Sequence, residues 1–393
     1  MAPPVAPQLH TLADTDTVRW EGKGVKATQV GARLLGLRQE ASDVEGFPLA
    51  RASVMNLLVF VADASREPLA THALDELALR HPARGIIIEP IPGQRFGLDA
   101  EVAVHRHPLA SHGLVYERAV LRVHGADPEG MDTLVIPLLI PHLQSFLWWL
   151  GDPSIVNPGL RSLGRICDRL IIDSKLGPAD RLVDVALELG STAALGARAD
   201  LPSFGRLVIG DTNWMRLDGF RQTLAAIFDE GHRAEYLAGL RSFEVVGARG
   251  LRHPATAAEL LMLGWVSSRI GCSSPAWVDG GVSMRHDAAG HRIHFSFSAG
   301  GAAGRGAVLP PIHAIRLEAE VGRRKLQLEL TAHKGGGLLH CEETGVATVH
   351  RSVPLSHPNE TEAVSRELAR LGRDRVYEDS VQAAALIYGA LTS

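Results

Sequence analysis

The alternation of strand-like and helix-like segments constrains the fold of this chain most strongly. The run MNLLVFVAD, residues 55–63, is apolar apart from Asn56 and its final acid, as expected of a strand buried on both faces. The segment REPLATHALDELALRHPAR follows with apolar residues at helical spacing, and GIIIEPIP, residues 85–92, is a second strand-like run. A β-α-β unit of this kind builds a parallel sheet with a right-handed crossover.

The same alternation continues to about residue 270. The segment GLVYERAVLRVHG, residues 113–125, has helical spacing, although its end is equally compatible with a strand. Residues 134–151 are strongly apolar, but Pro137 and Pro141 break a helix, so we expect strand, crossing segment and strand rather than a membrane span. Further strands are expected at 169–174, 206–211 and 243–250. The sequence therefore predicts an α/β domain with a mainly parallel, Rossmann-like sheet and flanking helices.

The character of the chain changes after about residue 275. Three stretches alternate in polarity around Gly or Asp turns, which is typical of antiparallel hairpins, and two helical segments end the chain. We therefore expect an N-terminal tail and lead-in over residues 1–50, the α/β domain over 51–235, and an α+β domain with antiparallel hairpins over 236–393.

Composition excludes several classes of protein. The 393 residues carry a net charge of −4 without a basic block, which disfavours nucleic-acid binding. The first ten residues, MAPPVAPQLH, have no signal-peptide pattern. The three cysteines lie far apart without disulfide or metal-finger spacing, as expected in a reducing compartment. We expect a cytoplasmic protein that uses neither a membrane nor a cofactor.

Acids and tryptophans gather where the predicted strands end. Because ligands of open α/β sheets bind at the carboxyl ends of strands, these side chains are candidates for a ligand crevice or a partner-binding site. The same residue types also favour turns and helix caps, which is the competing interpretation. The candidate set is Trp148, Trp149, Asp152, Asp173, Ser174, Asp211, Asn213, Trp214 and Arg216.

Common catalytic motifs are missing from the sequence. It contains no phosphate-binding GxxxxGK[ST], no nucleophile elbow GxSxG and no zinc motif HExxH. The glycine-rich stretch 299–307 opens no helix, so we interpret it as a connection. The sequence alone therefore indicates no catalytic residue and no metal site.

Four segments in collinear order resemble the OpcA family of bacterial glucose-6-phosphate dehydrogenase assembly proteins. They are HLQSFLWWLGDP, CDRLIIDS, DTNWMRLDGFRQTLAAIFD and AAELLMLGWVSSRIG, spread over residues 142–271. Four positions depart from the family pattern: His142 replaces an acid, Leu150 replaces a proline, and Gly219-Phe220 replaces Pro-Trp.

The resemblance implies a non-catalytic protein. Such a protein would bind glucose-6-phosphate dehydrogenase, promote its active oligomer and raise its activity in the oxidative pentose phosphate pathway. The candidate residues then form a partner-binding site, or they are a signature of the fold while the partner contacts the hairpin domain. An enzyme acting on a sugar phosphate in the acid-lined crevice is the alternative.

Overall fold

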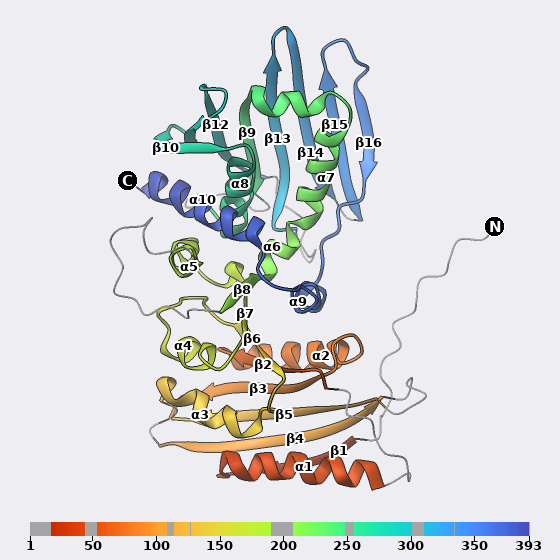
Figure 1. Cartoon of the computed structure of the whole chain (residues 1–393), viewed down its shortest axis with the longest axis vertical. Helices are drawn as coiled ribbons and strands as arrows, with labels where there is room; N and C mark the ends of the chain where they lie inside the picture. The colour runs from red at the N-terminus through yellow and green to blue at the C-terminus, as the bar shows by residue number, and fades with distance from the viewer. Residues whose placement is uncertain are drawn as a thin grey trace, which may run out of the picture. The chain divides into compact units, whose positions relative to one another are not determined.

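The computed structural model describes residues 17–43, 53–93, 95–107, 114–125, 127–189, 207–247, 255–300, 310–333 and 335–392. The chain divides into two compact units, residues 1–148 and 149–393 (Figure 1). The predicted domain ranges 51–235 and 236–393 stay a prediction. Residues 1–16 and 44–50 of the predicted tail lie outside the described residues, as does nearly all of the glycine-rich stretch 299–307.

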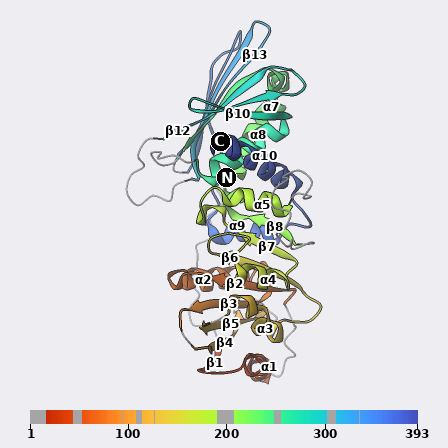
Figure 2. The same cartoon turned by 90° about the vertical axis from the view of Figure 1, so that its left-hand side faces the viewer.

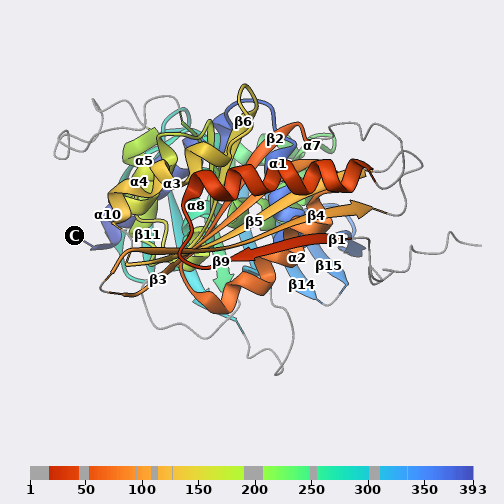
Figure 3. The ribbon, with the colours of Figure 1, turned by 90° about the horizontal axis from the view of Figure 1, so that it is seen from below.

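The first unit is a mixed sheet between helices. Its strands are β1 (Thr17–Gly22), β2 (Met55–Val61), β3 (Ala83–Ile91), β4 (Gly97–His107), β5 (Leu114–His124) and β6 (Gln144–Leu150). They lie in the order β1-β4-β5-β3-β2-β6. Figure 3 shows α1 (Ala27–Asp43) and α2 (Glu67–Leu77) on opposite faces of this sheet. All seven residues of β2 are accordingly buried.

The predicted, mainly parallel sheet is confirmed only in part. Strands β2, β3 and β5 are parallel, as the β-α-β unit requires. In contrast, β4 runs antiparallel to both β5 and β1. Six residues separate β4 from β5, which is too few for the crossover that a parallel pair needs, so these strands pair antiparallel. The unit is therefore α/β with a mixed sheet.

Two local expectations for the first unit were wrong. Residues 114–124 form strand β5 rather than a helix, because all eleven pair with β4 in register. The first strand expected in 134–151 is instead helical, as α3 (Met131–Val135) continues into a 3₁₀ turn with Pro137 near its start. Within the predicted tail and lead-in, residues 17–22 form β1 and residues 27–43 form α1.

The second unit begins with a parallel pair of short strands. These are β7 (Arg169–Ile172) and β8 (Val208–Asp211). The helices around them are α4 (Pro158–Gly164), α5 (Arg181–Leu189), α6 (Thr212–Arg216) and α7 (Asp218–Asp229). Asn157 caps α4 through its side-chain oxygen, which accepts from the backbone of Gly159 and Leu160.

A second sheet, mostly antiparallel, follows. Its strands are β9 (Leu240–Gly247), β10 (Cys272–Val278), β11 (Gly281–His286), β12 (Arg292–Ala299), β13 (Ile312–Val321), β14 (Arg324–His333), β15 (Gly336–Glu343) and β16 (Val349–Val353). Their order is β10-β11-β12-β9-β13-β14-β15-β16, and only β9 and β12 are parallel within it. The predicted hairpins β11–β12 and β13–β14 are confirmed.

Helices cover one face of the second sheet. Figure 2 shows α7, α8 (Ala257–Arg269) and α10 (Arg375–Thr392) on the same side of its strands. The strands alternate accordingly: Leu328 and Leu330 of β14 are buried, whereas Gln327 faces solvent. Helix α9 (Glu360–Leu368) precedes α10 and is capped by Asn359, whose side chain accepts from the backbone of Glu362.

Candidate functional site

The ends of β7 and β8 lie side by side and carry the acids of the predicted site. Asp173 follows β7 and caps a 3₁₀ turn by accepting from the backbone of Lys175 at 3.1 Å. Asp211 ends β8 and caps α6 by accepting from the backbone of Asn213 at 2.9 Å. One oxygen of Asp211 also accepts from the backbone of Ser174 at 3.1 Å. The bond between Ser174 and Asp211 thus joins the two strand ends, while each acid caps the turn or helix that follows its own strand.

Arg216 holds the centre of this cluster. Its two terminal nitrogens each lie 3.0 Å from an oxygen of Asp173, and one also donates to Glu360 at 2.5 Å. Asn213 donates to the Ser174 hydroxyl at 3.0 Å. A bidentate arginine–carboxylate pair of this kind has a fixed geometry. Both oxygens of the Asp173 carboxylate consequently accept hydrogen bonds from within the protein.

Burial shapes the protonation of these groups. Asp211 has no exposed surface, and burial together with the nearby Asp173 charge raises its pKa to about 6. Burial also raises the pKa of Glu360. Burial opposes the charge on Arg216, but Asp173 and Glu360 outweigh it and raise the pKa of the guanidinium. The cluster therefore keeps one cation among several carboxyl groups away from solvent.

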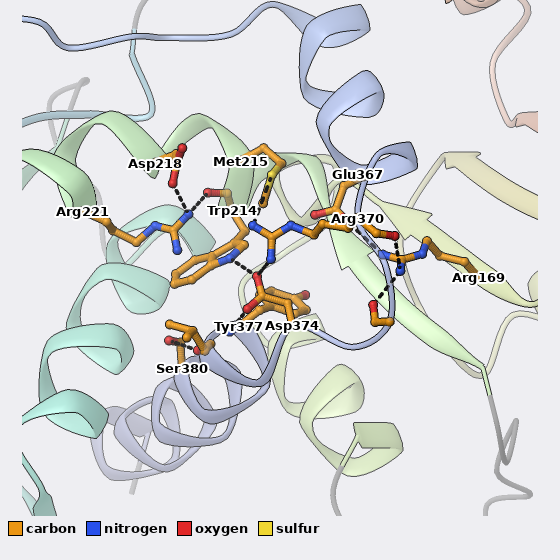
Figure 4. A network of polar contacts seen from close by, with 12 residues as sticks. Arg169, Trp214, Met215, Asp218, Arg221, Glu367, Arg370, Asp374, Tyr377 and Ser380 are labelled. Carbon is orange, nitrogen blue, oxygen red and sulfur yellow. Dashed lines mark hydrogen bonds and ion pairs between the residues drawn. The ribbon is translucent and has the colours of Figure 1, made fainter. Parts of the chain in front are cut away.

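The C-terminal helices complete the cluster from the opposite side. Tyr377 of α10 donates to Asp211 at 3.4 Å. Trp214 donates its indole N–H to Asp374 at 3.0 Å (Figure 4). Arg221 lies over the Trp214 ring, 3.3 Å from its centroid. Arg370 pairs with the same Asp374. Aromatic and charged groups thus join α6 and α7 to α10.

A second buried ion pair connects β7 to α9. Arg169 contacts Glu367 at 3.3 Å and donates to the carbonyls of Arg370 and Gly372 (Figure 4). Burial raises the pKa of Glu367 to about 7, although Arg370 and Arg169 oppose that shift. Gly210 of β8 leaves the space that Glu367 fills, since a Cβ there would lie 2.1 Å from its carboxylate.

The three tryptophans of the candidate set are all buried. Trp148 and Trp214 have no exposed surface and Trp149 has 1 %. Because successive strand residues point to opposite faces, both faces of β6 are covered here. Trp149 donates to the carbonyl of Asp152 at 2.9 Å. These indoles pack in the core of the protein, and none of them presents a surface to a partner in this conformation.

Asp152 is the exposed member of the set. It accepts two bonds from Arg181, at 2.7 and 3.0 Å, and 44 % of its side chain is exposed. The structure therefore brings Asp173, Ser174, Asp211, Asn213 and Arg216 into one cluster, and Trp214 lies on α6 between Asn213 and Arg216. Asp152 stays in a separate surface pair.

The cluster has the chemistry of a buried junction. Among the described residues, no three His, Cys, Asp or Glu side chains come together as metal ligands would. The carboxylates of Asp173 and Asp211 accept from Arg216 and from backbone N–H groups within the chain. An arrangement of this kind fixes the strand ends, and it offers a substrate no exposed acid.

Comparison with known proteins shows the family of this chain. Residues 74–186 match a family profile described as the N-terminal domain of the glucose-6-phosphate dehydrogenase subunit OpcA, and residues 208–381 match the corresponding C-terminal domain. Together the two profiles cover more than half of the chain. The chain belongs to the OpcA family. The resemblance of its four sequence segments to OpcA proteins is thereby confirmed.

Relatives of this OpcA-family chain occur in cyanobacteria. A protein of Nostoc punctiforme is 25 % identical over 341 residues, which cover 80 % of this chain and 67 % of the relative. One of Synechococcus elongatus is 26 % identical over 335 residues, covering 79 % of this chain and 68 % of the relative. Both carry the name OpcA, with a provisional description as OxPP cycle proteins.

Sequence reasoning missed the C-terminal half of the OpcA cluster. Glu360, Glu367, Asp374 and Tyr377 come from α9 and α10, at least 144 residues from the partners they meet at the strand ends. Nothing in the local pattern of these helices indicates those partners. A charged helical residue without an oppositely charged residue four positions on could indicate a distant partner, but such residues are common at protein surfaces.

Sequence reasoning also missed the exposed tryptophan. All six tryptophans are described, and Trp277 on β10 is the most exposed, with 62 % of its surface accessible. It resembles a surface anchor more than the paired Trp148 and Trp149 do.

None of the helices in the described ranges combines the length and apolarity needed to span a bilayer.

Proposed function

We propose that this chain is a non-catalytic assembly partner of glucose-6-phosphate dehydrogenase. One observation carries the proposal: two collinear profiles, both described as domains of a glucose-6-phosphate dehydrogenase subunit, match residues 74–186 and 208–381. The names of the cyanobacterial relatives, which refer to the OxPP cycle, point to the same pathway. The protein would act in the cytoplasm, where that dehydrogenase works.

This chain acts by shifting the dehydrogenase from its inactive form to its active oligomer. It binds the active oligomer of the dehydrogenase more tightly than the inactive form, and the difference in binding free energy moves the equilibrium. A coupling of about 1–3 kcal/mol changes substrate affinity roughly 5–150-fold. No bond-making by the chain itself is needed, which agrees with strand-end acids that are buried and internally paired.

The experiment mixes the purified full chain with the dehydrogenase of the same organism. Size-exclusion chromatography with light scattering measures the assembly, and steady-state rates at varied glucose 6-phosphate measure KM. We expect co-elution, a larger dehydrogenase oligomer and a lower KM. Separate elution at micromolar concentrations together with unchanged kinetics would contradict the proposal.

The exposed Trp277 is the first position to test for contact with the dehydrogenase. Interface anchors are enriched in tryptophan, and their truncation commonly costs about 2 kcal/mol or more, roughly a 30-fold loss of affinity. We expect Trp277→Ser to weaken association by about tenfold or more. Leu371→Ser is the control, because Leu371 is fully exposed between α9 and α10. Equal weakening by both variants would show a general effect of exposed apolar area.

The candidate set is proposed to support that contact indirectly. The buried Asp173, Asp211 and Arg216 fix the shape of the unit, so their substitution changes binding through folding. The sugar-phosphate enzyme predicts instead that the isolated chain converts a sugar phosphate and that Asp211→Asn abolishes conversion while the circular dichroism spectrum is retained. Absence of turnover in the isolated chain supports the assembly role.

A further inference from the structure

Two histidines face each other on the edge of the second sheet. His340 of β15 and His350 of the edge strand β16 are direct cross-strand neighbours (Figure 1). Leu339 and Cys341 on either side of His340 are buried, so His340 points to the opposite face of the strand. Among the described helices, α7, α8 and α10 lie on the other face of the sheet (Figure 2). His350 is exposed and 32 % of the His340 side chain is accessible.

The two rings approach each other through nitrogen atoms. The Nδ1 atoms lie 3.0 Å apart, whereas the ring centroids are 4.3 Å apart and the rings are tilted by 42°. Two neutral nitrogens at this distance need a proton or a cation between them, because two lone pairs facing each other repel. Either an N–H of one ring that donates to the other or a cation bound to both nitrogens removes this repulsion.

Glu342 fixes the orientation of the first ring. Its Oε1 lies 3.1 Å from Nε2 of His340, and a carboxylate oxygen only accepts, so Nε2 carries the hydrogen. The lone pair of His340 Nδ1 then points at His350. A carboxylate on the outer nitrogen of an imidazole is the arrangement that orients histidine ligands in metal sites.

The distance between the nitrogens discriminates among coordination geometries. Imidazole nitrogens bind divalent first-row ions at about 2.0–2.1 Å, so a 3.0 Å separation corresponds to an angle of about 91–97° at the ion. A tetrahedral ion requires about 109°, whereas neighbouring ligands of a square-planar or tetragonal ion subtend about 90°. The pair thus fits Ni²⁺ or Cu²⁺ better than Zn²⁺.

We infer that His340 and His350 form a chelating site for a divalent transition-metal ion of tetragonal preference. His350 binds as its Nε2–H tautomer, so the hydrogen that bridges the two rings without metal moves to its outer nitrogen or to solvent. Among the described residues no third side chain joins the pair as a ligand. Water therefore fills the remaining positions, and the ion exchanges with chelators such as EDTA.

Nickel titration tests the inference. The full chain without a histidine tag is titrated with Ni²⁺ by calorimetry, where we expect saturable binding, weaker binding of Zn²⁺ and no binding of Mg²⁺. His340→Ala and His350→Ala should each lower Ni²⁺ affinity by about tenfold or more, and Glu342→Ala by a smaller factor. His72→Ala is the matched control, because exposed His72 pairs with Glu76 on α2 without a second imidazole.

Hydrogen exchange supplies a second readout, independent of total metal bound. Ni²⁺ bridges β15 to β16, so amide exchange in residues 349–353 should slow on metal addition in the unmodified chain and in His72→Ala. Both ligand variants should lose that protection. The inference would be overturned by equal Ni²⁺ affinity in the unmodified chain and both ligand variants. It would also be overturned if the amide exchange rate in β16 did not change on metal addition.

Discussion

Two aspartate–arginine pairs show how the surroundings of a residue decide its role. Asp173 and Asp152 both follow strands, and each accepts two bonds from one arginine. The Asp173–Arg216 pair leaves 2 % and 10 % of the side chains exposed, while the Asp152–Arg181 pair leaves 44 % and 26 %. Breaking a buried pair strands a charge away from water, whereas an exposed partner regains its hydration.

The residue-scale prediction compares these pairs directly. Asp173→Asn should lower the free energy of unfolding by about 3–5 kcal/mol, because Arg216 loses its main carboxylate partner inside the protein. Asp152→Asn should change it by less than about 1 kcal/mol. Urea unfolding followed by tryptophan fluorescence measures both. Similar losses in the two variants would show that burial does not separate the pairs.

At the scale of elements, the second unit depends on how closely its helices approach. Helix α8 is buried over ten of its thirteen residues, and its Gly264 lies against the backbone of α10. A Cβ at that position would be 2.2 Å from the carbonyl oxygen of Ser380. A glycine is required there because the neighbouring atoms are backbone and cannot rotate away.

A pair of glycine substitutions tests this packing. Gly264→Ala should destabilise the chain by about 2 kcal/mol or more, since α8 and α10 must separate to admit the methyl group. Gly389→Ala lies in an exposed part of α10 with no atom within 4 Å of the new Cβ, and should stabilise by about 0.5–1 kcal/mol. Thermal unfolding of both variants gives the two signs. The prediction fails if Gly264→Ala and the unmodified chain unfold at the same temperature.

For the whole molecule, the buried carboxyl groups set how stability responds to pH. The pKa of Asp211 rises to about 6 and that of Glu367 to about 7, mainly through burial. Between the unfolded and folded pKa values the folded chain binds more protons than the unfolded chain. Stability from these groups is therefore full below about pH 4 and is lost as the pH rises toward 7.

Glu367→Gln isolates one of these groups. Its ordinary pKa is 4.5, so the unmodified chain should lose stability relative to the variant as the pH rises from about 4.5 to 7, with no further change above. Urea midpoints at half-unit pH steps measure the difference. Glu362→Gln, an exposed acid on the same helix paired with Arg366, is the control. Parallel curves for the unmodified chain and Glu367→Gln would refute the shift.

Local patterns predicted many elements of both units. The β-α-β unit over residues 55–92 and the hairpins after residue 275 depend on neighbours within a few positions, and the structure confirms them. Strand β5 was expected as a helix because its strand form is fixed by pairing with β4. Residues 134–138 were expected in a strand, although Pro137 stands near the start of a 3₁₀ turn.

The candidate site was predicted in its strand-end half only. The chain itself determined that Asp173 and Asp211 end parallel neighbours, because strand and cap preferences are local and parallel strands align their carboxyl ends. Tertiary structure alone decided that Trp148, Trp149 and Trp214 are buried, and that α9 and α10 bring Glu360 and Tyr377 against those acids. Burial and ion pairing depend on segments more than a hundred residues apart, and their free energy is gained only after the chain has closed.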